Sequence, residues 1–399
     1  LRLAPALAPV VGLLLVLLVD ALWPKQRGLH VAIGAFSLAA GASAAVPGAL
    51  STADAPVLSL CVPGGLDGAC LWSAGPIAST LQIGVLASTL AVLLLMLDRD
   101  RGDAVDVVLL LGAAAGGVAV AASRDLGTWL VTLELATIPI VALVALRGAG
   151  RAVHAATTLL MTSLLSFALL VVGVALWLTA TSDPSFSEVS VRAAWADPTT
   201  RPVLAVAAIA LIAGLAFKLS LVPFHAWTPI AWGEGPIPVT TLLASTSKLA
   251  ATAALIVVLE PFAALVGARP GPHAVAFVLG ALAIASMVVG TVVAFRQHDV
   301  VRLLAWSTLA QGGWVVLPLA ALTAAGARAA SAYALVYAAA VIVAFAAAST
   351  LPSRRLTAYT GLIRTHPHVG LPLAFALLTF AGLPPGVLGL VAKVAAMRA

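Results

Sequence analysis

Apolar segments of about twenty residues follow one another along almost the whole chain, and this feature constrains the fold more than any other. A helix of about 20 apolar residues matches the thickness of a bilayer, so each segment is long enough to cross a membrane. Of the 399 residues, 62% are hydrophobic and only 9% are charged, which is too little charge for the surface of a soluble domain. The sequence therefore predicts an all-α integral membrane protein.

Twelve membrane-spanning helices are predicted, and the seventh is interrupted. Their ranges are 4–22, 29–47, 77–97, 104–122, 127–146, 153–180, 203–232, 238–259, 273–295, 299–322, 329–350 and 370–397. No single apolar segment has the features of a cleaved signal peptide, so the whole chain is expected to lie in the membrane. The first residue is Leu1 rather than a methionine, which is typical of a fragment or of a chain with incomplete ends.

The distribution of basic residues predicts the orientation of these helices, because cytoplasmic loops carry an excess of Lys and Arg. With the N-terminus outside, the inner side holds Lys25, Arg27, Arg99, Arg101, Arg147, Arg151, Arg296, Arg302, Arg354, Arg355 and Arg364. The outer side then holds Arg2, Arg124, Arg192, Arg201, Arg269, Arg328 and Arg398. This positive-inside bias, rather than a nucleic-acid partner, explains the net charge of +6.

The two cysteines, Cys61 and Cys70, both lie in the longest polar connection, 48–76. On the outer side of a membrane they can form a disulfide, and two separate thiols are the other interpretation. Neither cysteine belongs to a C-x-x-C motif, and no pair of histidines has the spacing of a haem or metal site. No metal centre is predicted.

Lysine and arginine are used at different places in this chain. The predicted spans leave all seventeen arginines in loops or at helix ends, whereas Lys218, Lys248 and Lys393, three of only four lysines, lie within apolar segments. A guanidinium group does not lose its proton in proteins, but a buried amine can. Lysine at these positions is therefore typical of a group that gains and releases protons.

Glu134 is the one carboxylate in the middle of a predicted span. Each ionisable side chain at membrane depth costs about 3 kcal/mol to insert, so Glu134 and the three lysines together cost about 10 kcal/mol. A Glu–Lys pair that only fixes the packing of helices is one interpretation. Because one carboxylate cannot neutralise three amines, a functional role is the better interpretation.

Two of the predicted spans contain helix breaks close to a buried lysine. Pro223 follows Lys218 in "FKLSLVPFHAWTPIAWGEGPIPVT", and Pro384 and Pro385 precede Lys393 in "FAGLPPGVLGLVAKVAAM". Irregular backbone at membrane depth persists only where it is buried in protein or lines a watery cavity. Two interrupted helices in separate halves of a chain indicate a transporter built from internal repeats.

His225 follows the first break and is a candidate proton carrier, since histidine titrates near neutral pH. A packing residue held by hydrogen bonds is the alternative interpretation. Its place at the kink, near Lys218, favours the relay.

Five motifs in this order resemble the antiporter-like membrane subunits of respiratory complex I, and most of all its bacterial subunit N family. They are "LELATIPIVALVAL", "FKLSLVPFHAWTP", "GPIPVTTLLASTSKLAA", "VRLLAWSTLAQGGW" and "AGLPPGVLGLVAK". The resemblance covers about 77–397. It implies a fold with fourteen helices and two inverted five-helix repeats, of which this chain holds about twelve helices.

By position, the resemblance implies a role for each buried group. Glu134 and Lys218 match a modulating ion pair, Lys248 matches the central lysine, and Lys393 matches the lysine of the broken twelfth helix. His225 matches the histidine after the first break.

Two positions depart from the family pattern. Ile230 replaces an acid and is followed by "WGEG" at 232–235, so no role is expected for that acid here. Gln311 stands where a histidine is common, so a relay through it requires water or amide hydrogen bonds.

The resemblance divides the chain into N-terminal helices with their polar loop (1–100), a first antiporter-like repeat (101–260) and a second, incomplete repeat (261–399). It implies a proton-translocating subunit of NADH–quinone oxidoreductase in a bacterial plasma membrane, without a redox centre of its own. NADH, FMN, iron–sulfur clusters and quinone are then expected in partner subunits.

Three alternatives to this function stay open. The first is an Mrp-type sodium/proton antiporter subunit, and the second is the equivalent membrane subunit of a hydrogenase complex. The third is a structural membrane subunit in which the buried lysines are permanently paired.

Overall fold

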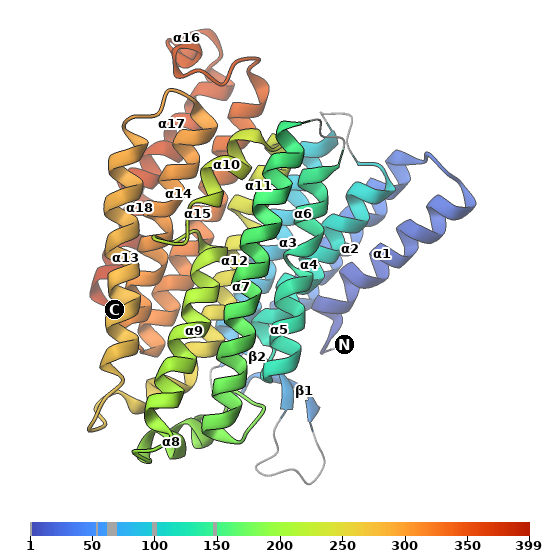
Figure 1. The fold of residues 1–399 in the computed structure, drawn as a ribbon. Helices are drawn as coiled ribbons and strands as arrows, with labels where there is room; N and C mark the ends of the chain where they lie inside the picture. Colours follow the sequence, from blue (N-terminus) through green and yellow to red (C-terminus); the bar gives the residue numbers. More distant parts are fainter. Residues whose placement is uncertain (1, 53–54, 62–69, 98–101, 147–149) are drawn as a thin grey trace.

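The computed structural model is a bundle of helices that run roughly parallel to one another, as Figure 1 shows. It describes residues 2–52, 55–61, 70–97, 102–146 and 150–399. In these ranges, eleven helical stretches are long and apolar enough to cross a membrane. The predicted all-α membrane fold is confirmed, and the twelfth predicted span is present as two shorter helices.

The first four spans lie on the N-terminal side of the bundle, with α1 and α2 at its edge (Figure 1). They are α1 (Ala4–Leu22), α2 (Arg27–Ala49), α3 (Pro76–Leu97) and α4 (Ala104–Ala122). The predicted ranges 4–22 and 104–122 coincide with α1 and α4. Many side chains of α1 face outward and are apolar, with Leu14 and Leu18 more than half exposed. Such a surface fits contact with lipid or with another membrane protein.

The polar connection between α2 and α3 folds into a short hairpin. Strand β1 (Val57–Cys61) pairs antiparallel with β2 (Cys70–Ala74), and a disulfide joins Cys61 to Cys70. The hairpin is attached to the link between α4 and α5, because the backbone N–H of Arg124 donates to the carbonyl of Leu71 at 3.0 Å. We call this end of the bundle the hairpin end; it also holds the short helix α8 (Glu188–Ala196).

The middle of the chain contains three interrupted spans. They are α5 (Leu126–Leu135) with α6 (Ile138–Ala145), α9 (Arg201–Leu219) with α10 (Trp227–Glu234), and α11 (Ile237–Ala244) with α12 (Thr246–Leu259). The long helix α7 (Arg151–Thr181) packs along α9. The interruption after Leu219 confirms the break expected near Pro223.

The last part of the chain contains three continuous spans and a broken one. The continuous spans are α13 (His273–Ala294), α14 (Val300–Val316) with η3 (Leu317–Ala321), and α15 (Ala324–Thr350). The broken span consists of α17 (Pro367–Ala381) and α18 (Val387–Arg398), separated at Pro384 and Pro385 as expected. Two short elements, η4 (Leu356–Tyr359) and α16 (Leu362–Thr365), connect α15 to α17, and η2 (Glu260–Leu265) follows α12.

The sequence predicts two broken spans, and the structure contains more than two. Two further interruptions occur, at Ala136–Thr137 between α5 and α6 and at Ser245 between α11 and α12. Pro139 lies in the first turn of α6 and removes a backbone donor there, which explains the first. At the second, the backbone of Ser245 departs from helical geometry, with φ of −110° and ψ of −79°, and no proline lies at that position.

The core lies along Ile237–Leu265, the most enclosed of the described spans, which contains α11 and α12. Helices α3, α4, α9 and α15 all pack against it. Helix α12 and the end of α9 at Lys218–Leu221 are thereby removed from the surrounding bilayer, and the polar groups that they carry must find partners within the protein.

Candidate functional site

The first part of the site is an ion pair between two helix ends. Glu134 lies in the last turn of α5, and Lys218 lies in the last turn of α9. The Lys218 Nζ atom is 2.9 Å from Glu134 Oε1 and donates a hydrogen bond of 2.8 Å to the hydroxyl of Thr137. Thr137 lies in the interruption between α5 and α6, so that break supplies a partner for the ammonium group.

Both members of this pair are withdrawn from solvent. The side chain of Lys218 is 6% exposed and that of Glu134 is 15% exposed. Burial of an uncompensated ion is costly, whereas a paired ion with a further hydrogen bond is stable in the same place. The pair therefore depends on both partners being present and ionised.

The second part of the site joins Lys248 to the end of α9. Ser220 adopts the left-handed conformation with φ of 60°, which ends the helix and leaves the Lys218 carbonyl free of its helical partner. The Lys248 Nζ atom donates to this carbonyl at 2.9 Å and to the hydroxyl oxygen of Ser220. Thr228 of α10 donates to the same Ser220 oxygen at 2.7 Å. The break thus provides acceptors for a second buried ammonium group.

Lys248 has no carboxylate partner among the described residues, and it is only 5% exposed. The ring of Trp227 lies 5.5 Å from its Nζ atom, in the range of a cation–π contact. On the neighbouring α3, the hydroxyls of Ser88 and Thr89 lie 2.9 and 3.2 Å from that of Thr246. These three hydroxyls connect α12 to α3 on a different side of the helix from the amine, whose own hydroxyl partner is Ser220.

The third part of the site surrounds Lys393 at the break of the last span. Its Nζ atom donates to the carbonyls of Phe380 and Ala381 at 2.6 and 3.2 Å. Gly382 ends α17 with φ of 73°, a conformation that glycine adopts without strain, and Lys393 packs over it. The ring of Trp314 lies 5.1 Å from Nζ.

Gln311 belongs to this third part. Its Nε2 atom donates to the Phe380 carbonyl at 3.4 Å, so Gln311 and Lys393 share one acceptor. The Tyr333 hydroxyl donates to Gln311 Oε1, and Tyr337 bonds Thr308 at 2.7 Å one helical turn away. A line of polar side chains therefore extends from Lys393 into α14 and α15.

Helix α14, which carries Gln311 of the third part, passes close to the break in α9. A Cβ atom at Gly312 would lie 3.2 Å from the carbonyl oxygen of Leu219, so the two backbones approach closely here. On α13, the Ser286 hydroxyl accepts the N–H of Val222 at 2.9 Å. Gln311 is the neighbour of Gly312 in sequence, and the close approach places its helix beside Lys218 and Ser220.

His225 lies in the segment between α9 and α10, downstream of Pro223. Its ring packs edge-on against Trp306 with centroids 5.4 Å apart, and its buried Nδ1 atom has no hydrogen-bond partner. Among the described residues, no hydrogen bond joins His225 to Lys218 or Lys248. Its role in a relay stays a prediction.

The structure therefore brings Glu134, Lys218 and Lys248 together, and it places Lys393 with Gln311 in a separate cluster. Sequence reasoning missed five partners in these contacts: Thr137, Ser220, Thr228, Tyr333 and Trp314. For Thr137 the sequence held a signal, because Pro139, two positions later, indicates a helix break there. Within the described ranges, no three His, Cys, Asp or Glu side chains form a metal-binding group.

Broken helices that carry paired and unpaired amines in a multi-pass bundle define the class of antiporter-like membrane subunits. Residues 123–399 match the family described as "NADH:quinone oxidoreductase/Mrp antiporter, TM". The chain is 34% identical to NADH-quinone oxidoreductase subunit N 2 of Streptomyces griseus, over all of this chain and 76% of that protein. It is 36% identical to subunit N of Salinispora tropica, over 89% of this chain and 72% of the relative.

Two solved structures have the same fold. A chain of respiratory complex I from Thermus thermophilus with bound aureothin aligns with a TM-score of 0.79 and 28% identity, over 99% of this chain and 83% of that one. A chain of the Mrp complex from a Dietzia species aligns with a TM-score of 0.85 and 22% identity, over 100% and 74%, which is a likeness of fold alone. The chain belongs to the family of NADH-quinone oxidoreductase subunit N.

Proposed function

We propose that this subunit translocates protons across the membrane along Glu134, Lys218, Lys248 and Lys393, within the membrane arm of an NADH–quinone oxidoreductase. The observation that carries the proposal is the pair of contacts from Lys248 Nζ to the Lys218 carbonyl and to Ser220. Through these contacts Lys248, which has no carboxylate partner among the described residues, is held beside Lys218, which is paired with Glu134.

Glu134 acts as the modulating charge in this mechanism. While it is ionised and close to Lys218, it favours the ammonium form of that lysine. When the pair separates, Lys218 loses this support, and its proton becomes easier to release. Because the buried groups interact strongly, their protonation belongs to the set of sites rather than to any one residue.

The released proton passes through ordered water to the Ser220 hydroxyl, which Lys248 contacts, then to Lys248 and on to Lys393. Between the last two lysines, the proposed carriers are Gln311, Tyr333 and ordered water. Gln311 cannot be protonated at ordinary pH, so it passes protons only by exchange of hydrogen bonds. His225 is a second candidate carrier at the break of α9.

The energy for pumping comes from partner subunits in this proposal. Moving one proton against 100 mV costs about 2.3 kcal/mol. NADH, FMN, iron–sulfur clusters and quinone are assigned to other subunits of the complex, with which this chain assembles through its exposed apolar surfaces. The bacterial plasma membrane is the proposed location, with the N-terminus and the hairpin end outside.

No specific observation favours the Mrp or hydrogenase alternative. The Mrp complex shares the fold at 22% identity, whereas subunits N of NADH-quinone oxidoreductases are 34% and 36% identical to this chain. The unpaired amine of Lys248 also argues against a purely structural set of fixed ion pairs.

The test is NADH-driven proton uptake into sealed vesicles that contain the assembled complex, with Lys248→Met compared with wild type. Lys25→Met is the matched control, because Lys25 is exposed between α1 and α2. We expect the assembled Lys248 variant to lose most of both proton uptake and quinone reduction, while the Lys25 variant keeps both. Wild-type uptake and turnover in the Lys248 variant would show that this amine is structural.

A further inference from the structure

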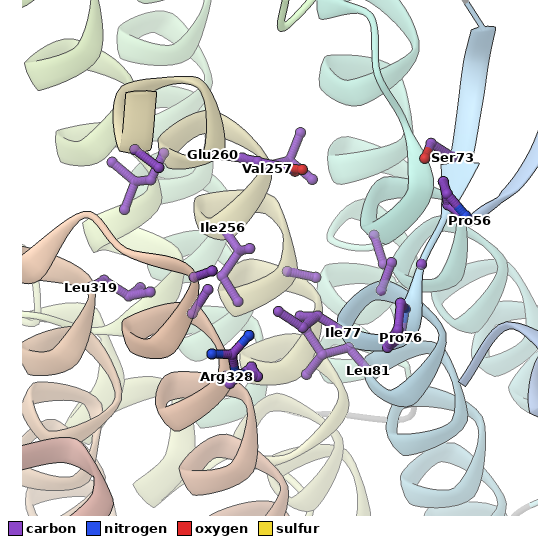
Figure 2. A pocket seen from close by; sticks show the side chains of 18 of the residues that line it. Pro56, Ser73, Pro76, Ile77, Leu81, Ile256, Val257, Glu260, Leu319 and Arg328 are labelled. Atoms are coloured by element: carbon purple, nitrogen blue, oxygen red, sulfur yellow. The ribbon is translucent and has the colours of Figure 1, made fainter. Parts of the chain in front are cut away.

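A cleft of about 470 Å³ opens at the hairpin end of the bundle, outside the chain of lysines. It lies where α12 ends, between the first turns of α3 and of α15, as Figure 2 shows. Its walls are mostly aliphatic and include Ile77, Leu81, Ile256, Val257 and Leu319. The volume falls within the range of about 300–1,000 Å³ that is usual for sites of small ligands.

Three charged side chains line the same cleft. Arg124 donates one hydrogen bond to the carboxylate of Glu260 and a second, of 3.4 Å, to the carbonyl of Ser73. Arg328, in the second turn of α15, is exposed and has no hydrogen bond or ion pair with any described residue. Two guanidinium groups therefore face one carboxylate, which leaves the cleft with an excess positive charge.

The combination of apolar walls and a free guanidinium favours a lipid in this cleft over a water-filled path for protons. A water-filled path for protons needs polar groups along its length, and the aliphatic walls formed by Ile77, Leu81, Ile256, Val257 and Leu319 offer none. A hydrocarbon chain gains by leaving water for such walls, and a phosphate is a preferred partner of arginine. The hairpin end is also an end of the membrane-spanning helices, where lipid headgroups lie.

We propose that this cleft binds one anionic phospholipid, with an acyl chain against Ile256 and Leu319 and its phosphate at Arg328. Glu260 keeps Arg124 occupied, so Arg328 is the residue that selects the anionic headgroup. The bound lipid fills the space between α3, α12 and α15 and fixes the end of α12, the helix that carries Lys248. The proposal is independent of the direction in which protons move.

Photolabelling of the whole complex tests this proposal. The complex is placed in vesicles that contain phosphatidylglycerol with a photoactivatable acyl chain, or phosphatidylcholine with the same chain, and labelled peptides are mapped by mass spectrometry. We expect phosphatidylglycerol to label the peptides that contain Ile256 or Leu319 more strongly. Arg328→Gln is expected to lower this labelling about fivefold, the effect of one arginine near an anionic headgroup.

Arg269→Gln is the matched control, because Arg269 is exposed in the loop before α13 at the same end of the bundle. Ala327→Phe is a second variant, which fills the cleft from α15 while Arg328 is kept, and it is expected to lower labelling as well. Equal labelling by the two lipids, or an Arg328 variant that labels like wild type, would overturn the proposal. Unlabelled cleft peptides in the wild-type complex would do the same, since they would show that a partner subunit fills the space.

Discussion

The amine of Lys248 donates a hydrogen bond of 2.9 Å to the backbone carbonyl of Lys218. Two lysines on different helices are thus connected without a carboxylate between them. The side chain of Lys218 points to Glu134, while its carbonyl accepts from Lys248. A shift of the end of α9 therefore changes the surroundings of both amines at once, which is the coupling that a relay between them requires.

Removal of the Ser220 hydroxyl is expected to slow proton transfer to Lys248. Ser220→Gly deletes this acceptor and keeps the left-handed backbone, because glycine adopts positive φ without strain. A hydrogen bond to a charged group contributes about 1.5–3 kcal/mol, so we expect proton uptake to fall about tenfold. The measurement is NADH-driven uptake by the assembled complex.

Ser182→Gly provides the control for this variant. Ser182 ends α7 in the same left-handed conformation, with φ of 53°, but it lies outside the site. It is expected to change uptake little. An equal loss in both variants would mean that backbone flexibility, and not the hydroxyl, is responsible.

Glu134→Gln is expected to destabilise the subunit more than the removal of both partners of its ion pair. The single change leaves the ammonium of Lys218 buried without a counter-charge, at a cost of about 3 kcal/mol. The double variant Glu134→Gln with Lys218→Met removes the unpaired charge and should recover part of this loss. Thermal unfolding of the purified complex measures the difference, and a double variant less stable than the single one would contradict the expectation.

Gln311→Leu is expected to weaken the cluster around Lys393. It leaves the buried hydroxyl of Tyr333 without its acceptor, which costs about 1–3 kcal/mol, and it breaks the proposed path between Lys248 and Lys393. Gln311→His should preserve proton uptake, because imidazole accepts a hydrogen bond and carries protons.

Gln297→Leu is a suitable comparison, because Gln297 is half-buried just after the end of α13 and its amide bonds the carbonyl of Val293, one turn earlier in the chain. Uptake per NADH oxidised is the quantity to compare. If the leucine and histidine variants at Gln311 behave alike, proton transfer does not pass this side chain.

Gly382→Ala is expected to displace Lys393. The backbone there has φ of 73°, which costs an alanine about 1–2 kcal/mol, and the added Cβ would lie 3.1 Å from Lys393 Cδ. Gly361 has the same φ of 73° with no atom within 4 Å of an added Cβ, so Gly361→Ala carries the backbone cost alone. Loss of uptake in the Gly382 variant only is the expected result; equal loss in the two would remove the steric argument.

The membrane-spanning helices were predictable because the length of an apolar segment determines whether it can cross a bilayer. The ends of α1 and α4 agree with the predicted ranges, since each is flanked by polar or charged residues. The breaks beside Pro223 and Pro385 were also predictable, because proline removes a backbone donor. The short helix α8 was missed, although Ser187 caps it and Glu188 lies in its first turn, a usual signal of a helix start.

The contacts of the buried amines were not predictable from sequence. Thr137 and Lys218 are 81 positions apart, and Lys248 and Ser220 are 28 apart. Such pairs depend on how helices cross, which local propensity and hydrophobic period leave open. The break at Ser245 was missed because no proline or glycine marks it in the sequence.

The carbonyl oxygens of Lys218, Phe380 and Ala381 are acceptors for lysine amines only because two helices, α9 and α17, stop where they do. These acceptors belong to the main chain, and every amino acid supplies the same atom. Side-chain replacement can therefore not delete them one at a time, and comparison of sequences cannot display them. In a subunit of this kind, part of the proposed proton path is determined by the backbone conformation. Replacement of a backbone amide by an ester is the chemical change that would test the role of such a carbonyl.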